Sequence, residues 1–112
     1  MFKFSSKKTK RKRKVKREIF KWVRRNSFLV SNHKRWYVGI TNNSARRKRE
    51  HEAKNKAECK YWKAWDLESI QMSLDLETEL HRIGMLDKDY KGGYTNRSTF
   101  IYVYKKKPTI ID

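Results

Sequence analysis

The sequence predicts a small α/β (α+β) fold in which helices flank an antiparallel three-stranded sheet and a basic helix precedes the sheet. Short β-rich segments alternate along the chain with segments of helical periodicity. The length of 112 residues suits one small domain. The aromatic content of 13% is too high for a disordered chain, although the hydrophobic content of 37% is low for a globular one. Part of the chain is therefore expected to fold around a core.

The first expected element is a helix over about residues 9–25, whose C-terminal half docks on the domain and whose first half is a charged arm. The apolar residues that recur there at helical spacing are Val15, Ile19, Trp22 and Val23. Residues 7–17 read KKTKRKRKVKR, so we expect this run to stay solvated until a polyanion binds it. We therefore divide the chain into a basic arm and helix, residues 1–25, and a domain, residues 26–112.

The next segment is expected to form a β-hairpin, which leads into a second helix. Residues 27–30 and 35–40 are rich in aromatic and β-branched side chains, and the polar residues 31–34 between them suit a turn. Residues 41–44, Thr-Asn-Asn-Ser, supply N-cap chemistry. The helix that they begin is expected to end near residue 56.

A third strand, a third helix and a last strand are expected in the second half. Residues 60–72 are ambiguous because they are rich in aromatic residues. The residues that suit a strand there are Leu67, Ile70 and Met72. The helix is expected to begin near Ser73 and to end at Gly84. Its apolar residues at helical spacing are Leu76, Leu80 and Ile83. A loop at residues 91–93 precedes the last strand, residues 99–104.

The charge of the chain predicts a polyanionic partner. Thirty Lys and Arg residues against twelve Asp and Glu residues give a net charge of +18, far more than solubility requires. Residues 1–25 contain thirteen of these cations and one acid, which gives this segment a net charge of +12. The charge is therefore concentrated in the basic arm.

Several protein classes are excluded by composition. No apolar run approaches the roughly 18 to 20 residues that a membrane span needs, and Lys and Arg occupy the place of a signal peptide's apolar region. The single cysteine excludes an intrachain disulfide framework and a cysteine-based zinc site. We expect no membrane partner and an intracellular location, cytoplasmic or, in a eukaryotic host, nuclear.

Residues 36–51, WYVGITNNSARRKREH, resemble the second half of the GIY-YIG nuclease signature. In that family a strand ending in Tyr-Ile/Val-Gly leads through a Thr-Asn turn into a helix with an Arg and a His on one face. Tyr37-Val38-Gly39 corresponds to the YIG element. Arg47 follows Tyr37 by ten residues and His51 follows Arg47 by four, which are the family's spacings.

Two further segments resemble the same family. Residues 76–81, LETELH, are similar to the helix that carries the family's metal-binding glutamate, which gives that role to Glu77. Composition alone leaves Glu79 as an equal candidate. Gly92-Gly93 and Asn96, before the last strand, are similar to the family's closing segment.

The resemblance implies a metal-dependent DNA endonuclease. Tyr37 would act as the general base or orient the attacking water, and Arg47 would stabilise the charge that develops on the phosphate. His51 would relay a proton, and Glu77 would hold one Mg²⁺ or Mn²⁺ ion. The partner would be duplex or branched DNA, with RNA as a second substrate class. The expected nucleic-acid-binding residues are Lys10, Arg11, Lys12, Arg13, Lys14, Arg46, Lys48, Arg49 and Asn96.

The chain departs from the family at its first motif. Counting back from Tyr37 along the expected hairpin, the first-motif Tyr falls on Ser27. Phe28 and Tyr102 are the aromatic residues that could fill the same space. The competing interpretation is a non-catalytic, basic nucleic-acid-binding protein on a degenerate nuclease fold, because the basic arm needs no active site to bind a polyanion.

Overall fold

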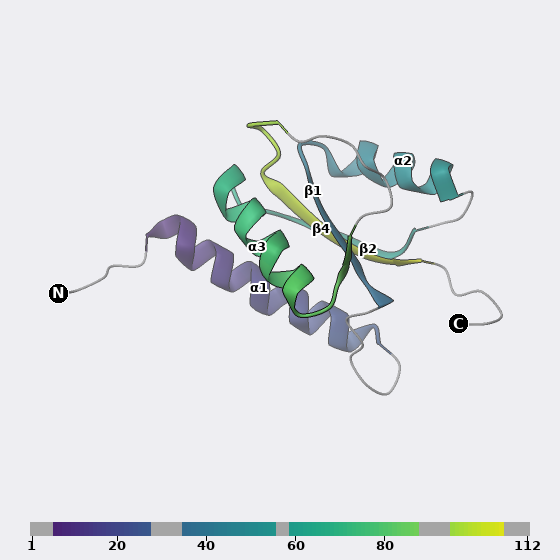
Figure 1. The fold of residues 1–112 in the computed structure, drawn as a ribbon, viewed down its shortest axis with the longest axis horizontal. Helices are drawn as coiled ribbons and strands as arrows, with labels where there is room; N and C mark the ends of the chain where they lie inside the picture. Colours follow the sequence, from purple (N-terminus) through teal and green to yellow (C-terminus); the bar gives the residue numbers. More distant parts are fainter. Residues whose placement is uncertain (1–5, 28–34, 56–58, 88–94, 107–112) are drawn as a thin grey trace.

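The computed structural model describes residues 6–27, 35–55, 59–87 and 95–106. In chain order its elements are α1 (Lys7–Arg25), β1 (Tyr37–Thr41), α2 (Ser44–Asn55), β2 (Cys59–Asp66), α3 (Ile70–Arg82), β3 (Leu86–Asp87) and β4 (Phe100–Lys106). The described residues thus combine three helices with a sheet, and the predicted α+β class is confirmed (Figure 1). No helix in these residues is long and apolar enough to cross a bilayer.

The sheet has the strand order β2-β4-β1-β3. Strand β4 pairs antiparallel with both β1 and β2, so these three strands form the predicted antiparallel sheet. Strand β3 was not predicted and adds a short parallel pair beside β1, with Tyr37 opposite Leu86. The last strand in the sequence is therefore central in the sheet and holds the other strands together.

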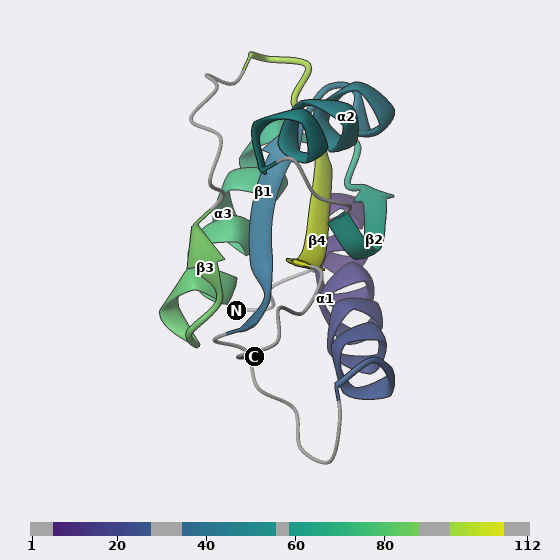
Figure 2. The ribbon, with the colours of Figure 1, turned by 90° about the vertical axis from the view of Figure 1, so that its right-hand side faces the viewer.

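The alternation of side chains along the strands divides the molecule into two layers. Ile101 and Val103 of β4 belong to a core that also contains Ile19 of α1 and Leu76 of α3. Tyr102 and its neighbours on the same face belong to a separate aromatic cluster, which α2 covers. Figure 2 shows the resulting arrangement, with α2 on one face of the sheet and with α1 and α3 on the other.

The C-terminal half of α1 is packed onto the domain as expected, and contacts with the domain extend back to Arg11, so residues 7–17 are mostly exposed but not wholly solvated. Val15 is buried in the core. The Arg11 guanidinium donates to the Asp66 carbonyl oxygen at 2.8 Å and lies 3.0 Å from the Glu68 carboxylate. Only the outward-facing side chains of α1 remain exposed. The division of the chain at residue 25 stays a prediction.

Two long-range ion pairs join α1 to α3. The Lys12 and Lys16 ammonium groups donate to the two carboxylate oxygens of Glu79, at 2.5 and 2.7 Å. Burial raises the pKa of the Glu79 carboxyl, but the hydrogen bonds and the charges of Lys12 and Lys16 outweigh this effect and lower the pKa below its ordinary value. Glu79 is therefore ionised at neutral pH and neutralises part of the arm's charge.

The predicted position of the third strand is wrong. Strand β2 ends at Asp66, and residues 70 and 72 belong to α3, because Ser69 accepts a hydrogen bond from the Met72 amide and caps this helix. Helix α3 therefore begins before Ser73. The first hairpin strand after Ser27 and the loop at residues 91–93 lie outside the described residues.

Strand β2 is irregular where it carries two neighbouring aromatic residues, which face opposite layers as successive residues of any strand do. The register with β4 shifts between Lys60 and Lys63, and Tyr61 has a φ angle of 58°. The Tyr61 ring packs in the α1 layer, whereas the Trp62 ring joins the aromatic cluster under α2.

We expect Glu79→Gln to destabilise the protein by about 1 kcal/mol at pH 7, because it removes two partly exposed ion pairs. A pKa lower in the folded than in the unfolded chain gives a stabilisation that is full above the unfolded pKa of about 4.3. This stabilisation is lost as the pH falls through the folded pKa. The melting-temperature difference between wild type and variant should therefore shrink below pH 4.

Glu68→Gln is the matched control for this experiment. Its partner Arg11 lies at an exposed surface, and the exposed fractions of the two side chains are 44% and 63%. We expect a smaller loss of stability than for Glu79→Gln. An equal loss for the two variants, or a difference from wild type that does not change with pH, contradicts the assigned role of Glu79.

Candidate active site

The imidazole of His51 is buried between two tyrosine hydroxyl groups. Its Nε2 lies 2.9 Å from the Tyr102 hydroxyl oxygen, and its Nδ1 lies 3.1 Å from that of Tyr104. A neutral imidazole has one donor and one acceptor nitrogen. One tyrosine hydroxyl therefore accepts a hydrogen bond from the ring, and the other donates a hydrogen bond to it. His51 has no exposed surface, and any proton that it exchanges with solvent must pass through a neighbouring group.

Stacked aromatic rings surround this group. The Trp62 ring stacks on Tyr102 with 4.5 Å between centroids, and Tyr37 stacks on Tyr104 at 5.1 Å with 11° between the ring planes. Tyr37 is partly exposed. Tyr37 therefore stacks on the same tyrosine, Tyr104, whose hydroxyl bonds to His51. The Tyr37 ring lies at the boundary between this cluster and solvent.

Gly39 leaves the space that Tyr102 occupies. The two residues are direct partners across β1 and β4. A Cβ atom on residue 39 would lie 2.6 Å from the Tyr102 Cζ and closer still to the hydroxyl oxygen. Glycine is thus needed here for close approach rather than for a special backbone angle.

The turn after β1 fixes the start of α2. The Thr41 hydroxyl oxygen accepts from the Asn43 amide at 3.1 Å, and the Asn43 side chain accepts from the Arg46 amide at 3.0 Å. These bonds satisfy amide groups at the helix N-terminus. Because Arg47 and His51 are one helical turn apart, this start also decides that both side chains face the sheet.

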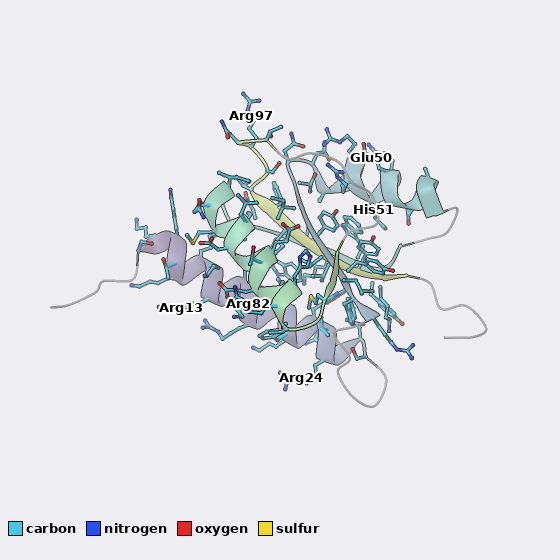
Figure 3. The ribbon with its side chains drawn as sticks, viewed as in Figure 1. Arg13, Arg24, Glu50, His51, Arg82 and Arg97 are labelled. Carbon is cyan, nitrogen blue, oxygen red and sulfur yellow. The ribbon has the colours of Figure 1, made fainter. Side chains whose placement is uncertain are left out.

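Arg47 is buried, with 6% of its side chain exposed, and its Nε lies 3.4 Å from the Glu50 carboxylate. Arg46 lies on the other side of Glu50, at 3.8 Å. Figure 3 shows Glu50 and His51 together on α2. A guanidinium at this depth keeps its charge and needs fixed acidic or polar groups around it. Glu50 is therefore one of the groups that position Arg47.

Glu77 and Glu79 lie on different flanks of α3. Two residues along a helix are separated by about 200° around its axis. Glu79 points toward α1, where it meets Lys12 and Lys16. Glu77 is partly buried on the opposite flank, beside the buried Leu76. The structure thus separates the two candidate ligands, although α3 packs on the other face of the sheet from His51.

The expected nucleic-acid contacts fall into three places. The exposed group on α1 comprises Lys10, Arg13 and Lys14, while Arg11 and Lys12 point toward acidic partners. On α2, Lys48 is partly buried and Arg49 exposed, and Arg46 also donates to the Asn42 side chain at 2.8 Å. Asn96 is exposed in the loop before β4. Their contacts with nucleic acid stay predictions.

Ser27 does not stand where the missing first-motif Tyr was expected. Its hydroxyl donates to the Val23 carbonyl oxygen at 2.6 Å and accepts from the Trp36 indole at 3.2 Å. Trp36 is buried in the α1 layer, whereas Tyr37 lies in the aromatic cluster on the other face. Tyr102 and Tyr104 supply the phenol groups near His51 instead.

Tyr104 and Glu50 are the members of this site that the sequence interpretation missed. Two tyrosines with one residue between them in a β-rich segment must share a face of the sheet, and this signal was present in residues 102–104. The spacing of three between Arg47 and Glu50 indicates a helical ion pair. Neither pattern indicates which buried group the side chains meet.

The family model that describes the GIY-YIG catalytic domain matches residues 25–80, which is half of the chain. The match confirms the resemblance seen in the sequence. It includes Tyr37, Arg47, His51 and Glu77, and it ends before β4 and its two tyrosines. No curated protein and no solved structure matches the chain.

We expect Gly39→Ala to destabilise the protein by about 1 to 3 kcal/mol, because the new methyl group overpacks the site against Tyr102. Denaturant unfolding measures this cost. The same substitution in a Tyr102→Phe background should cost less, since the nearest of the opposing atoms is then absent. An equal cost in both backgrounds would show that the hydroxyl group of Tyr102 is not responsible for the overpacking.

Proposed function

The chain belongs to the GIY-YIG family, and we propose from this premise that it is a metal-dependent endonuclease that hydrolyses phosphodiester bonds in DNA. The observation that carries the proposal is the group on the α2 face of the sheet. Tyr37 lies at its exposed margin, Arg47 is buried nearby on α2, and His51 is held by two tyrosine hydroxyls. Hydrolysis of a phosphodiester needs a positioned water and groups that stabilise the developing charge.

Tyr37 is the group that we assign to the attacking water. Its ring is fixed by stacking on Tyr104, so its hydroxyl occupies one place at the margin of the cluster. A hydroxyl group held at a fixed point can orient a water molecule, and it can accept the water's proton once its own proton has left. The fixed ring lowers the entropic cost of bringing the water to the phosphorus.

His51 and its tyrosine partners supply a route for the proton. The Tyr102 and Tyr104 hydroxyls and the two imidazole nitrogens form a continuous chain of hydrogen bonds. When one tyrosine hydroxyl gives its proton to the ring, the other ring nitrogen gives its proton to the second hydroxyl, so a proton must enter at the first tyrosine and leave from the second. The tautomer of His51 then changes while the heavy atoms keep their positions. We assign His51 to the relay, and Tyr102 and Tyr104 to its positioning.

Arg47 is assigned to the phosphate. Its guanidinium offers several donors in one plane, which match two phosphate oxygens at the same time. A charge that is buried and already positioned stabilises the transition state without further rearrangement. Glu50 provides the opposing charge that keeps this side chain at its depth.

The metal is assigned to Glu77. A carboxylate oxygen is the kind of ligand that Mg²⁺ prefers, and Mg²⁺ commonly completes its shell with water and substrate phosphates. Glu79 is engaged by two lysines, which favours Glu77 as the ligand. Within the described residues no group of three His, Cys, Asp or Glu side chains could hold an ion. One Mg²⁺ or Mn²⁺ ion would stabilise charge on the phosphate oxygens and the leaving oxygen.

A non-catalytic DNA-binding protein is the second candidate. The net charge of +18 and the exposed outer face of α1 favour binding whether or not the chain cleaves. The two candidates differ in one respect, because a protein that only binds DNA does not require Glu77 or the charge of a buried Arg47.

We expect Glu77→Gln to abolish Mg²⁺-dependent nicking of supercoiled plasmid and to leave DNA binding unchanged or tighter, because a negative charge near the phosphates is lost. Glu79→Gln is the matched control, and it should reduce stability while cleavage continues at a temperature well below melting. Agarose gels with Mg²⁺ and with EDTA measure the cleavage. Loss of activity in Glu79→Gln but not in Glu77→Gln would reverse the assignment.

We expect Arg47→Lys to lower the cleavage rate at least a hundredfold, because the charge stays while the planar pair of donors is lost. DNA affinity should change less than threefold. Arg49→Lys, at an exposed position of the same helix, is the control and should leave both quantities close to wild type. A loss of cleavage that only parallels a loss of affinity would make Arg47 an ordinary phosphate contact.

A further inference from the structure

The outer face of α1 carries a continuous row of cations. Lys10, Lys14, Arg17 and Lys21 follow one another at helical spacing, and all four are exposed. They lie on the side of the helix opposite to the buried residues Val15, Ile19 and Val23. In the described part of the chain the ion pairs of α1 involve Arg11, Lys12 and Lys16, and not these four residues.

The length of this row suits the backbone of a duplex. A helix of 19 residues is about 28 Å long, and the phosphates of one DNA strand follow one another every 3.4 Å or so along the axis. The row itself, from Lys10 to Lys21, rises about 16 Å and can therefore follow about five phosphates. Helix packing against the domain holds the cations in a line, which reduces the entropy that binding removes.

A hollow beside the row places an aromatic side chain next to these cations. The residues that line it are Glu18, Lys21, Trp22, Arg25 and Lys63. The Lys63 ammonium lies 4.9 Å from the centroid of the Trp22 ring, and Trp22 itself is anchored by a bond from its indole to the Tyr61 carbonyl oxygen. Cations next to an aromatic side chain are typical of surfaces that bind nucleic acid.

This surface and the candidate active site lie on opposite sides of the sheet. Arg13 and Arg24 extend from α1 at one margin of the molecule, and His51 lies under α2 beyond the strands (Figure 3). The buried core of α1, α3 and β4 fills the space between them. A straight duplex that lies along α1 therefore runs over the opposite face of the sheet from Arg47 and His51.

We propose that α1 forms a second duplex-binding surface, so that one chain holds two segments of DNA at the same time, one on α1 and one at the α2 face. The inference rests on the proposed function only in taking DNA as the ligand, and it does not require cleavage. It implies that the protein gathers crossing or branched segments, where two duplexes approach one another.

The test is the capture of a second duplex. A biotinylated duplex of 30 base pairs is bound to beads, and the protein is added in EDTA at less than one chain per duplex. A fluorescent duplex of unrelated sequence is then added. The amount of this second duplex that the beads retain is divided by the amount of protein on the beads. The wild-type protein should retain it.

The variant Lys10→Gln, Lys14→Gln, Arg17→Gln, Lys21→Gln tests the α1 surface. It should remain on the first duplex through the α2 face and capture at least tenfold less of the second. Lys48→Gln with Arg49→Gln, on α2, should lose capture as well while α1 still holds the first duplex. Matching melting temperatures establish that each variant is folded.

Two results would overturn the inference. One is capture by the α1 variant at the wild-type level, which would also be the result if pairing of two chains joined the duplexes. The other is a wild-type protein that binds the first duplex and captures no second one. A wild-type protein that binds neither duplex contradicts the proposed function as well as the inference.

Discussion

The hydrogen bonds between the His51 imidazole and the hydroxyls of Tyr102 and Tyr104 are the interaction on which the candidate site depends. These hydrogen bonds, 2.9 and 3.1 Å between nitrogen and oxygen, join α2 to the central strand β4. A buried imidazole without such partners would be costly, so the two tyrosines fix both the depth and the orientation of the helix. Trp62 and Tyr37 stack around the same rings, and Gly39 provides the space that Tyr102 fills.

The two faces of the sheet carry different kinds of side chains. The α2 face carries the aromatic cluster and the buried His51, and the other face carries an apolar core covered by α1 and by α3, the helix that also bears the proposed metal ligand Glu77. The cations of α1 thereby lie outside the site that the family resemblance predicts. Glu79 moderates this charge by binding Lys12 and Lys16, and it attaches the basic helix to the domain. From Arg11 onward the helix is consequently attached to the domain.

Local patterns predicted much of this fold. The apolar spacing of α1, the Thr-Asn turn before α2 and the β-rich last segment all act over a few residues, and their elements were found close to the expected positions. What depends on distant partners could not be predicted. Lys12 turns toward the domain because Glu79 of another helix binds it. Tyr104 of β4 likewise bonds to His51 of α2, and the register shift near Tyr61 arises in the pairing of β2 with β4.

The central claim is that the aromatic face under α2 carries out phosphodiester hydrolysis with the Tyr37 hydroxyl. The most direct measurement compares Tyr37→Phe with wild type on supercoiled plasmid in Mg²⁺, because this change removes the hydroxyl and keeps the ring that stacks on Tyr104. We predict that the wild-type protein nicks the plasmid in Mg²⁺ and not in EDTA. The variant should leave the plasmid intact with unchanged DNA affinity and melting temperature. Cleavage by Tyr37→Phe at the wild-type rate would contradict the account.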